Sequence, residues 1–373
     1  MSDPIRRALE DYVEAGAVPG LVWSVVRDGE VSRGELGTSR PGGSGVAVTA
    51  DTLFRLSSTT KPVTAAVAMT LVEDGTLGLD DPVDGWLPEL ADRRVLSHPE
   101  AGLTDTVPAA RPILVRDVLE FRLGLGYDFA GPPTAVLDTL EESGVHMGPP
   151  APQANPDPDA WLALFAPLPL MYQPGEKWLY NVGAEVLGVL VARASGTPLP
   201  ELLRSRVLEP LGMRDTGFSV PAADLSRLGP LWTPAQPGDE PSVYDEADGQ
   251  WSRPPAFPNG ADGLVSTVDD VVAFGQGLFG AALLPPETVR EMTTSRTTVN
   301  PAARLGWGLG LGVLEGEADG RHAGSYGWDG GLGTSWWNDP VTRTTAVLLT
   351  NQTWTSPEPP EHFRAFWRAA FGE

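Results

Sequence analysis

The sequence predicts an α/β protein of the α+β type, with one antiparallel sheet built from both ends of the chain. Near the N-terminus, Asp28-Gly29 separates two strand-like stretches, which is typical of a β-hairpin. Near the C-terminus, strand-like segments between Gly306 and Asn351 alternate with turn residues. The middle of the chain shows helical periodicity and proline-rich loops instead. We therefore expect helices from both termini to flank the sheet and a mainly helical region to be inserted into it.

The boundaries of these regions follow from the change in pattern along the 373 residues. We expect residues 1–373 to form a single unit. Its sheet subdomain should comprise about residues 1–60 and 255–373, and its helical subdomain about residues 61–254.

The first elements are a helix and a hairpin. Asp3-Pro4 combines an N-cap residue with a proline at the first helical position. Strands are expected at residues 21–27 and 30–37 on either side of the Asp28-Gly29 turn. The buried stripe of the helix consists of Ile5, Leu9, Tyr12 and Val13.

The middle of the chain contains helical patches and long loops. A short amphipathic patch begins at Val115, and a longer apolar helix runs from about Val186 to its glycine stop at Gly196. Residues 147–158 contain many prolines and no packing periodicity, so we expect an ordered or mobile surface loop there.

The C-terminal part predicts an antiparallel meander followed by a helix. Strands are expected at residues 306–314, 321–328, 332–337 and 342–351. An amphipathic helix over residues 363–371 then closes the chain.

Composition excludes several classes of function. A formal net charge of −23 argues against nucleic acid or an anionic membrane as a partner. The chain has no cysteine, which removes disulfides, thiolate nucleophiles and Cys-type zinc sites, and its four histidines are scattered. We expect no metal and no cofactor. Because no apolar leader or membrane-spanning run is present, we expect a cytoplasmic protein; the sequence does not specify its oligomeric state.

The stretch from Thr52 to Gly75 contains the first candidate for chemistry. It predicts a helix with Ser58 at its N-terminus and Lys61 one turn later. Free N–H groups at a helix N-terminus stabilise an oxyanion, and the positive end of the helix dipole favours a neutral lysine that can accept the serine proton. Ser57 is also one turn from Lys61, so the register leaves two candidate nucleophiles. The alternative is a solvated lysine beside a serine cap.

The rarity of lysine favours the catalytic interpretation. Lys61 and Lys177 are the only lysines, and arginine carries nearly all the positive charge. A lysine retained after this serine suggests proton transfer, which arginine cannot perform.

Two later segments could complete a site. Tyr180 precedes the long apolar helix, although a packing role would also explain it. Trp328-Asp329-Gly330-Gly331 lies in a glycine-rich segment that could equally be a simple hairpin.

Together, these motifs resemble the serine β-lactamase and penicillin-binding-protein superfamily, in particular class C β-lactamases and family VIII carboxylesterases. The resemblance covers most of the chain and includes Ser-x-x-Lys with a late strand motif ending in glycine. Its segments are residues 53–62, Pro174-Gly175, Tyr180, residues 209–218, residues 263–267 and the closing Trp-x-Gly.

The resemblance implies a fold of the β-lactamase type and a role for each motif. Ser58 would be the acylated nucleophile, Lys61 its activating partner and Tyr180 the second general base and acid. The N–H groups of Ser58 and Gly331 would form the oxyanion hole. Trp328-Asp329-Gly330 stands where the superfamily has Lys-Thr-Gly, and these three residues are expected to bind substrate.

The departures from the family pattern point to ester chemistry. Val182 replaces the asparagine of Tyr-x-Asn, Trp328 replaces the lysine, and Phe121-Arg-Leu-Gly124 replaces His-Thr-Ser-Gly. Groups suited to a β-lactam amide and carboxylate are thereby lost. Tyr127 and Val182 are also expected to contact substrate. Asp329 would either repel a substrate carboxylate or, by strand alternation, point to the protein side and cap the hairpin.

We therefore predict a carboxylesterase-like serine hydrolase acting on a small-molecule ester or amide. The alternatives are an acyltransferase or transesterase of metabolite biosynthesis, a D-amino acid peptidase or amidase and a non-catalytic ligand-binding protein. The last is disfavoured by the intact Ser58, Lys61 and Tyr180.

Overall fold

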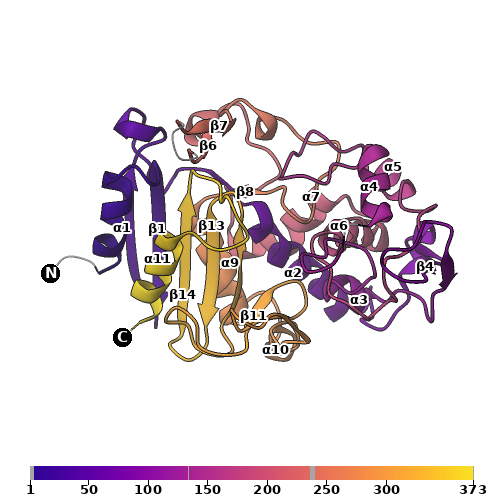
Figure 1. Cartoon of the computed structure of the whole chain (residues 1–373). Helices are drawn as coiled ribbons and strands as arrows, with labels where there is room; N and C mark the ends of the chain where they lie inside the picture. The colour runs from indigo at the N-terminus through magenta and orange to yellow at the C-terminus, as the bar shows by residue number, and fades with distance from the viewer. Residues whose placement is uncertain (1–3, 133, 236–239, 373) are drawn as a thin grey trace.

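The computed structural model describes residues 4–132, 134–235 and 240–372, and its centre is an eight-stranded antiparallel sheet (Figure 1). The strand order is β2-β1-β14-β13-β12-β11-β10-β9, so the first hairpin pairs with the last strand. The predicted α+β class is confirmed. The strands are β1 (Gly20–Arg27), β2 (Glu30–Gly37), β9 (Thr297–Asn300), β10 (Leu305–Trp307), β11 (Gly312–Leu314), β12 (Tyr326–Gly330), β13 (Thr334–Asp339) and β14 (Thr344–Thr350).

The predicted strand over residues 306–314 is wrong in one respect, because two antiparallel strands, β10 and β11, occupy it. The chain turns between them at Gly310, whose φ of +78° lies in the left-handed region that favours glycine. A side chain there would also collide with Ala65. Because Ala65, which restricts this position, is distant in sequence, periodicity could not reveal the break between the two strands.

Helices cover both faces of the sheet. α1 (Pro4–Glu14) and α11 (Glu361–Phe371) pack beside each other on one face (Figure 1). α2 (Thr60–Glu73) and α9 (Val268–Phe279) contribute to the core on the other face. Strand alternation assigns side chains to these layers: Trp336 packs on Phe274 of α9, whereas Trp337 belongs to the α11 core.

The remaining helices and short strands lie between β3 and β9 in the chain. Figure 1 shows α4, α5 and β4 far from α1 and α11. The helices are α3 (Val115–Leu119), α4 (Ala135–Glu142), α5 (Pro158–Ala163), α6 (Val182–Ser195), α7 (Leu199–Leu203), the π-helical η5 (Arg204–Leu208), α8 (Glu209–Leu211) and α10 (Pro286–Met292). The short strand pairs are β3 (Phe54–Arg55) with β8 (Val265–Ser266), β4 (Arg94–Leu96) with β5 (Thr106–Pro108) and β6 (Leu231–Thr233) with β7 (Ser242–Asp245).

Short 3-10 turns complete the secondary structure. They are η1 (Pro41–Gly43), η2 (Ser57–Thr59), η3 (Val83–Gly85), η4 (Pro88–Leu90), η6 (Leu225–Arg227) and η7 (Gln250–Ser252). The division of the chain into a sheet subdomain and a helical subdomain stays a prediction.

The proline-rich segment over residues 147–158 is held by hydrogen bonds from several directions. Its ends approach because Asn155 Oδ1 accepts from the His146 backbone N–H at 2.8 Å. Tyr244 donates to the Pro150 carbonyl at 2.7 Å, and Tyr127 donates to the Met147 carbonyl. A compact loop that is closed at its ends and tied to its surroundings in this way is typical of an Ω-loop.

Among the described residues, no single helix is both long and apolar enough to cross a membrane. The segments Val182–Ser195 and Leu199–Leu211 meet the length and composition criteria only as a pair, and they are bent by 82° at their junction.

Candidate active site

Ser58 lies in the 3-10 turn η2, directly before α2 begins at Thr60. The preceding residue, Ser57, has a φ of +48°, a left-handed conformation that is strained for a residue other than glycine. Such strain is tolerated where surrounding contacts enforce it, often at functional sites. Here the Leu56 carbonyl accepts a hydrogen bond from Thr334 Oγ1 at 2.7 Å, which ties the turn to β13.

The structure brings Ser58 to Lys61. Lys61 Nζ donates to Ser58 Oγ at 2.9 Å and to the Ala261 carbonyl at 3.1 Å. The lysine side chain is fully buried, whereas Ser58 is half-buried. Ser57, the alternative nucleophile, is only 2% exposed. Ser58 is thus the serine whose hydroxyl combines contact with Lys61 and access from outside.

Tyr180 completes the cluster around the Ser58 hydroxyl. Its phenol oxygen lies 2.8 Å from Ser58 Oγ and 3.1 Å from Trp328 Nε1. An indole N–H can only donate, so the Tyr180 oxygen accepts from Trp328 and shares a hydrogen with Ser58. Lys61 Nζ also lies 4.6 Å from the centroid of the Tyr180 ring, within the range of a cation–π contact.

Aromatic rings surround Tyr180. Phe129, Trp178, Trp328 and Phe121 have ring centroids 5.6, 5.6, 6.0 and 6.1 Å from that of Tyr180. Rings at this distance pack favourably and restrict the rotamers of the phenol.

The backbone around Tyr180 is fixed from both sides. Tyr180 and Tyr127 exchange two backbone hydrogen bonds of 2.9 Å. The next residue, Asn181, has φ 77° and ψ −64°, and Val182 N–H donates to the Tyr180 carbonyl at 3.1 Å. This is a γ-turn of the rare, strained form, and α6 starts directly after it. The turn lets the chain leave the Tyr127 bridge and enter α6 while the phenol still faces Ser58.

The candidate oxyanion hole lies where β12 passes the η2 turn. Gly330 permits this approach, since a side chain there would collide with the Leu56 carbonyl oxygen. The next residue, Gly331, is exposed. Among the described residues, neither the Ser58 N–H nor the Gly331 N–H donates to a turn or loop carbonyl. Both amides are therefore available to a ligand oxygen.

One predicted substrate-binding residue is not in the site. Asp329 accepts a hydrogen bond from Trp337 Nε1 at 2.9 Å and pairs across the strands with Ser335. Ser335 in turn accepts from Trp367 of α11 at 3.0 Å, so Asp329 lies on the α11 face of the sheet, opposite the face of Trp328. Burial raises the pKa of the Asp329 carboxyl, and the nearby Arg321 opposes that shift. The substrate-binding role of Asp329 is wrong, and its partner is Trp337 rather than the hairpin turn.

Val182 and Tyr127 also differ from expectation. Val182 is fully buried in the main core at the first position of α6, so it is shielded from substrate. Tyr127 is half-buried; its hydroxyl holds the 147–158 loop and its ring stacks on Phe129 at 6.2 Å. It positions Tyr180 through the backbone. Trp328 is half-buried and contacts the Tyr180 hydroxyl directly.

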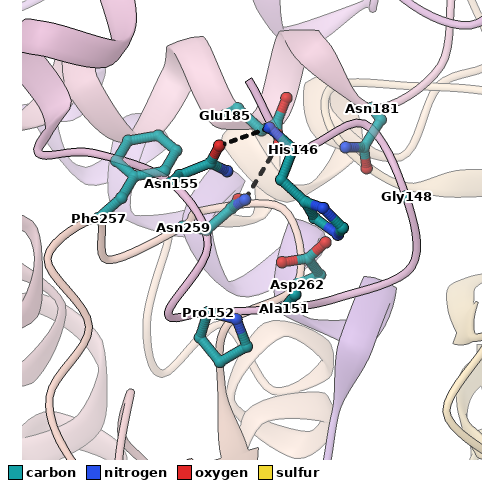
Figure 2. Close-up of a pocket in the computed structure, with 10 residues that line it drawn as sticks. All are labelled: His146, Gly148, Ala151, Pro152, Asn155, Asn181, Glu185, Phe257, Asn259 and Asp262. Carbon is teal, nitrogen blue, oxygen red and sulfur yellow. Dashed lines mark hydrogen bonds between the residues drawn. The ribbon is translucent and has the colours of Figure 1, made fainter. Parts of the chain in front are cut away.

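Sequence reasoning missed a polar pocket, shown in Figure 2, whose two acids, Glu185 and Asp262, interact electrostatically with Lys61. Burial raises the pKa of Glu185 to about 7, with a smaller contribution from the Asp262 carboxylate. Burial also raises the pKa of Asp262, while Lys61 and His146 oppose that shift. No short motif links these residues. The pocket is lined by His146, Gly148, Ala151, Pro152, Asn155, Asn181, Glu185, Phe257, Asn259 and Asp262.

Within the described ranges, no three His, Cys, Asp or Glu side chains are grouped so that they could hold a metal ion. The Ser58 hydroxyl lies within hydrogen-bond distance of the Lys61 amine and the Tyr180 phenol, two groups that can transfer protons.

Comparisons with known proteins agree with this chemistry. The family model described as Beta-lactamase matches residues 5–370. Protein Rv1367c of Mycobacterium tuberculosis (strain ATCC 25618 / H37Rv) is 35% identical over 365 residues, which cover 91% of this chain and 87% of the relative. Esterase EstB of Burkholderia gladioli is 31% identical over 355 residues, which cover 89% and 86%.

A solved structure extends the likeness to the fold. It is described as "EstCE1, a hydrolase with promiscuous acyltransferase activity", and it matches with a TM-score of 0.82 at 26% identity. The match covers 99% of this chain and 98% of that one.

Proposed function

Because the chain belongs to the β-lactamase family, we propose that it is a carboxylesterase-like serine hydrolase that forms an acyl-enzyme on Ser58. One observation carries the proposal: Ser58 Oγ lies 2.9 Å from Lys61 Nζ and 2.8 Å from the Tyr180 hydroxyl. A serine flanked by two groups that transfer protons is an activated nucleophile. The esterase relative supports an ester as the substrate class.

In the acylation step, Ser58 Oγ bonds to the ester carbonyl carbon while its proton passes to the Lys61–Tyr180 pair. Where Tyr180 is the proton acceptor, its oxygen carries negative charge before it takes the Ser58 proton and is neutral afterwards. Two contacts stabilise the charged form: the Trp328 N–H at 3.1 Å and Lys61 Nζ against the ring. When the single bond between the carbonyl carbon and the alkoxy oxygen breaks, the pair returns that proton to the leaving alcohol. Water then attacks the acyl-enzyme, and the same groups restore the proton to Ser58.

The Ser58 and Gly331 N–H groups would bind the oxyanion that forms on the carbonyl oxygen in both steps. In enzymes where one such donor has been removed, the loss is about 3–4 kcal/mol of transition-state stabilisation. The exposed position of Gly331 beside the buried Gly330 is consistent with an amide that faces the substrate.

Acyl transfer is the second candidate function. The structurally similar EstCE1 is described as a hydrolase with promiscuous acyltransferase activity. An alcohol or amine that reaches the acyl-enzyme before water would give this outcome with the same residues. Product analysis with added acceptors distinguishes the two reactions. The predicted cytoplasmic location belongs to this proposal as well.

Covalent labelling tests the proposal directly. A fluorophosphonate probe should modify the protein, and mass spectrometry should place the modification on Ser58. Ser58→Ala should abolish labelling and ester turnover, whereas the adjacent control Ser57→Ala should retain labelling. Labelling that survives Ser58→Ala but is lost in Ser57→Ala would overturn the assignment.

A further inference from the structure

Glu185 is a buried acid that the proposed mechanism does not use. It lies in the first turn of α6, five residues after Tyr180, and is only 4% exposed. It lines the pocket of Figure 2, whose free volume of about 10 Å³ has room for about one water molecule. The pocket is too small for a substrate, so a binding role does not explain why a carboxyl group is buried there.

A chain of hydrogen bonds connects Glu185 to the catalytic lysine. Asn259 Nδ2 donates to Glu185 Oε1 at 3.0 Å, as Figure 2 shows, and Asn259 Oδ1 accepts from the Ala261 N–H at 2.7 Å. The Ala261 carbonyl then accepts from Lys61 Nζ at 3.1 Å. Each of these atoms is buried, where a well-formed hydrogen bond restricts geometry most strongly.

The segment that carries Asn259 and Ala261 runs between two helices. Thr64 of α2 donates to the Gly260 carbonyl at 2.8 Å. A side chain on Gly260 would lie 2.8 Å from the Ala184 carbonyl of α6 and 2.9 Å from Thr64 Cγ2. The segment thus has contacts to α2, which bears Lys61, and to α6, which bears Glu185.

We propose that Glu185 and Asn259 are positioning residues for Lys61. Glu185 orients the Asn259 amide, Asn259 holds the backbone of Ala261, and the Ala261 carbonyl directs the lysine amine toward Ser58. The inference rests on the proposed roles of Ser58 and Lys61. The proposal adds residues of α6 and of the segment 259–261 to the groups that position Lys61.

This role requires a hydrogen-bond acceptor at Glu185 and not a charge. Asp262 and His146 also line the pocket, and the charges of Asp262 and Lys61 both act on Glu185, so the local electrostatic potential does not depend on the Glu185 carboxylate alone. A carboxyl oxygen accepts from Asn259 Nδ2 in either protonation state. Glutamine keeps such an oxygen, whereas methionine has similar volume and offers no comparable acceptor.

The experiment compares Glu185→Gln with Glu185→Met by the rate of fluorophosphonate labelling and by kcat and KM on p-nitrophenyl acetate. Because a displacement near 1 Å in an active site can reduce the rate about 100-fold, we expect Met to lower kcat about 10- to 100-fold with little change in KM. In Glu185→Gln, kcat should fall by no more than about threefold relative to wild type, and the pH–rate profile should be unchanged. An unchanged Met variant, or a Gln variant with the Met defect or a displaced profile, would overturn the inference.

Asp270 offers a matched control. It is a buried acid on α9 that accepts from the Asp215 N–H at 2.8 Å and Thr216 Oγ1 at 2.7 Å. Asp270→Leu should lower the melting temperature without a comparable loss of labelling rate in the folded protein. Equal losses of labelling rate in Asp270→Leu and Glu185→Met would show that Glu185 has only a general packing role.

Asn259→Ala interrupts the same chain and replaces Glu185→Met if that variant does not fold. Where all variants fold, the Glu185→Met/Asn259→Ala double variant should be no slower than the slower single variant. Fully additive losses would show that the two residues act independently and contradict the proposal. Failure of wild-type protein to label at Ser58 would instead refute the proposed function itself.

Discussion

Trp328→Phe tests the least conventional contact of the candidate site. The indole N–H of Trp328 donates to the Tyr180 oxygen at 3.1 Å, and its ring packs edge-to-face on Trp307 at 4.7 Å. Phenylalanine keeps an aromatic ring at this position but removes the donor. The proposed mechanism uses a negatively charged Tyr180 oxygen as the base, so the variant removes a hydrogen bond that stabilises this basic form.

The size of the effect separates two roles for Trp328. Hydrogen bonds to charged groups contribute about 1.5–3 kcal/mol, which corresponds to roughly 10- to 150-fold in rate. A hydrogen bond between neutral groups contributes about 0.5–1.5 kcal/mol, or roughly 2- to 12-fold. We expect Trp328→Phe to lower kcat by more than about tenfold.

The assay is steady-state hydrolysis of p-nitrophenyl acetate, with melting temperature as a check on folding. Trp307→Phe is the matched control, because the Trp307 indole N–H donates to the Leu119 carbonyl at 3.1 Å and not to Tyr180. A kcat for Trp328→Phe within about threefold of wild type, or no lower than that of Trp307→Phe, would refute a catalytic role for the indole N–H.

Tyr180→Phe should melt within a few degrees of wild type while kcat falls by about 10²–10⁴; near-normal kcat would make Tyr180 a packing residue. Asp329→Asn should change kcat/KM equally on neutral and anionic esters, and a selective gain on the anionic ester would place its carboxylate in the cleft. Esterase activity should persist after dialysis against EDTA. If EDTA removes the activity and added zinc restores it, the serine mechanism is contradicted. Burial raises the pKa of Glu185 to about 7, above the ordinary value of about 4.3, so its stabilising contribution is lost as pH rises through that window. Between pH 4 and pH 8, the melting temperature of Glu185→Gln should therefore fall less than that of wild type.

Local patterns were sufficient for the fold class and for the first pair of catalytic candidates. The Asp28-Gly29 turn and the alternation of the C-terminal strands predicted most strands that the two ends of the chain contribute, because turn geometry and side-chain direction in a strand depend on neighbouring residues. The edge strand β9 was not predicted. The spacing of Ser58 and Lys61 likewise predicted their contact, since one helical turn separates them. Alternation also indicated that Trp328 and Asp329 face opposite ways, but not which of them faces Ser58.

Only the tertiary structure decided which groups meet at the Ser58 hydroxyl. The Tyr180 contact with Ser58 spans 122 positions in sequence, and the Trp328 contact with Tyr180 spans 148. Ser57 and Ser58 both lie about one helical turn from Lys61, but the folded chain buries Ser57 and leaves Ser58 accessible. The chain from Glu185 through Asn259 to Lys61 has no sequence signature at all. Periodicity determines how a side chain points from its own element, whereas the partner that it meets depends on how distant elements pack into one core.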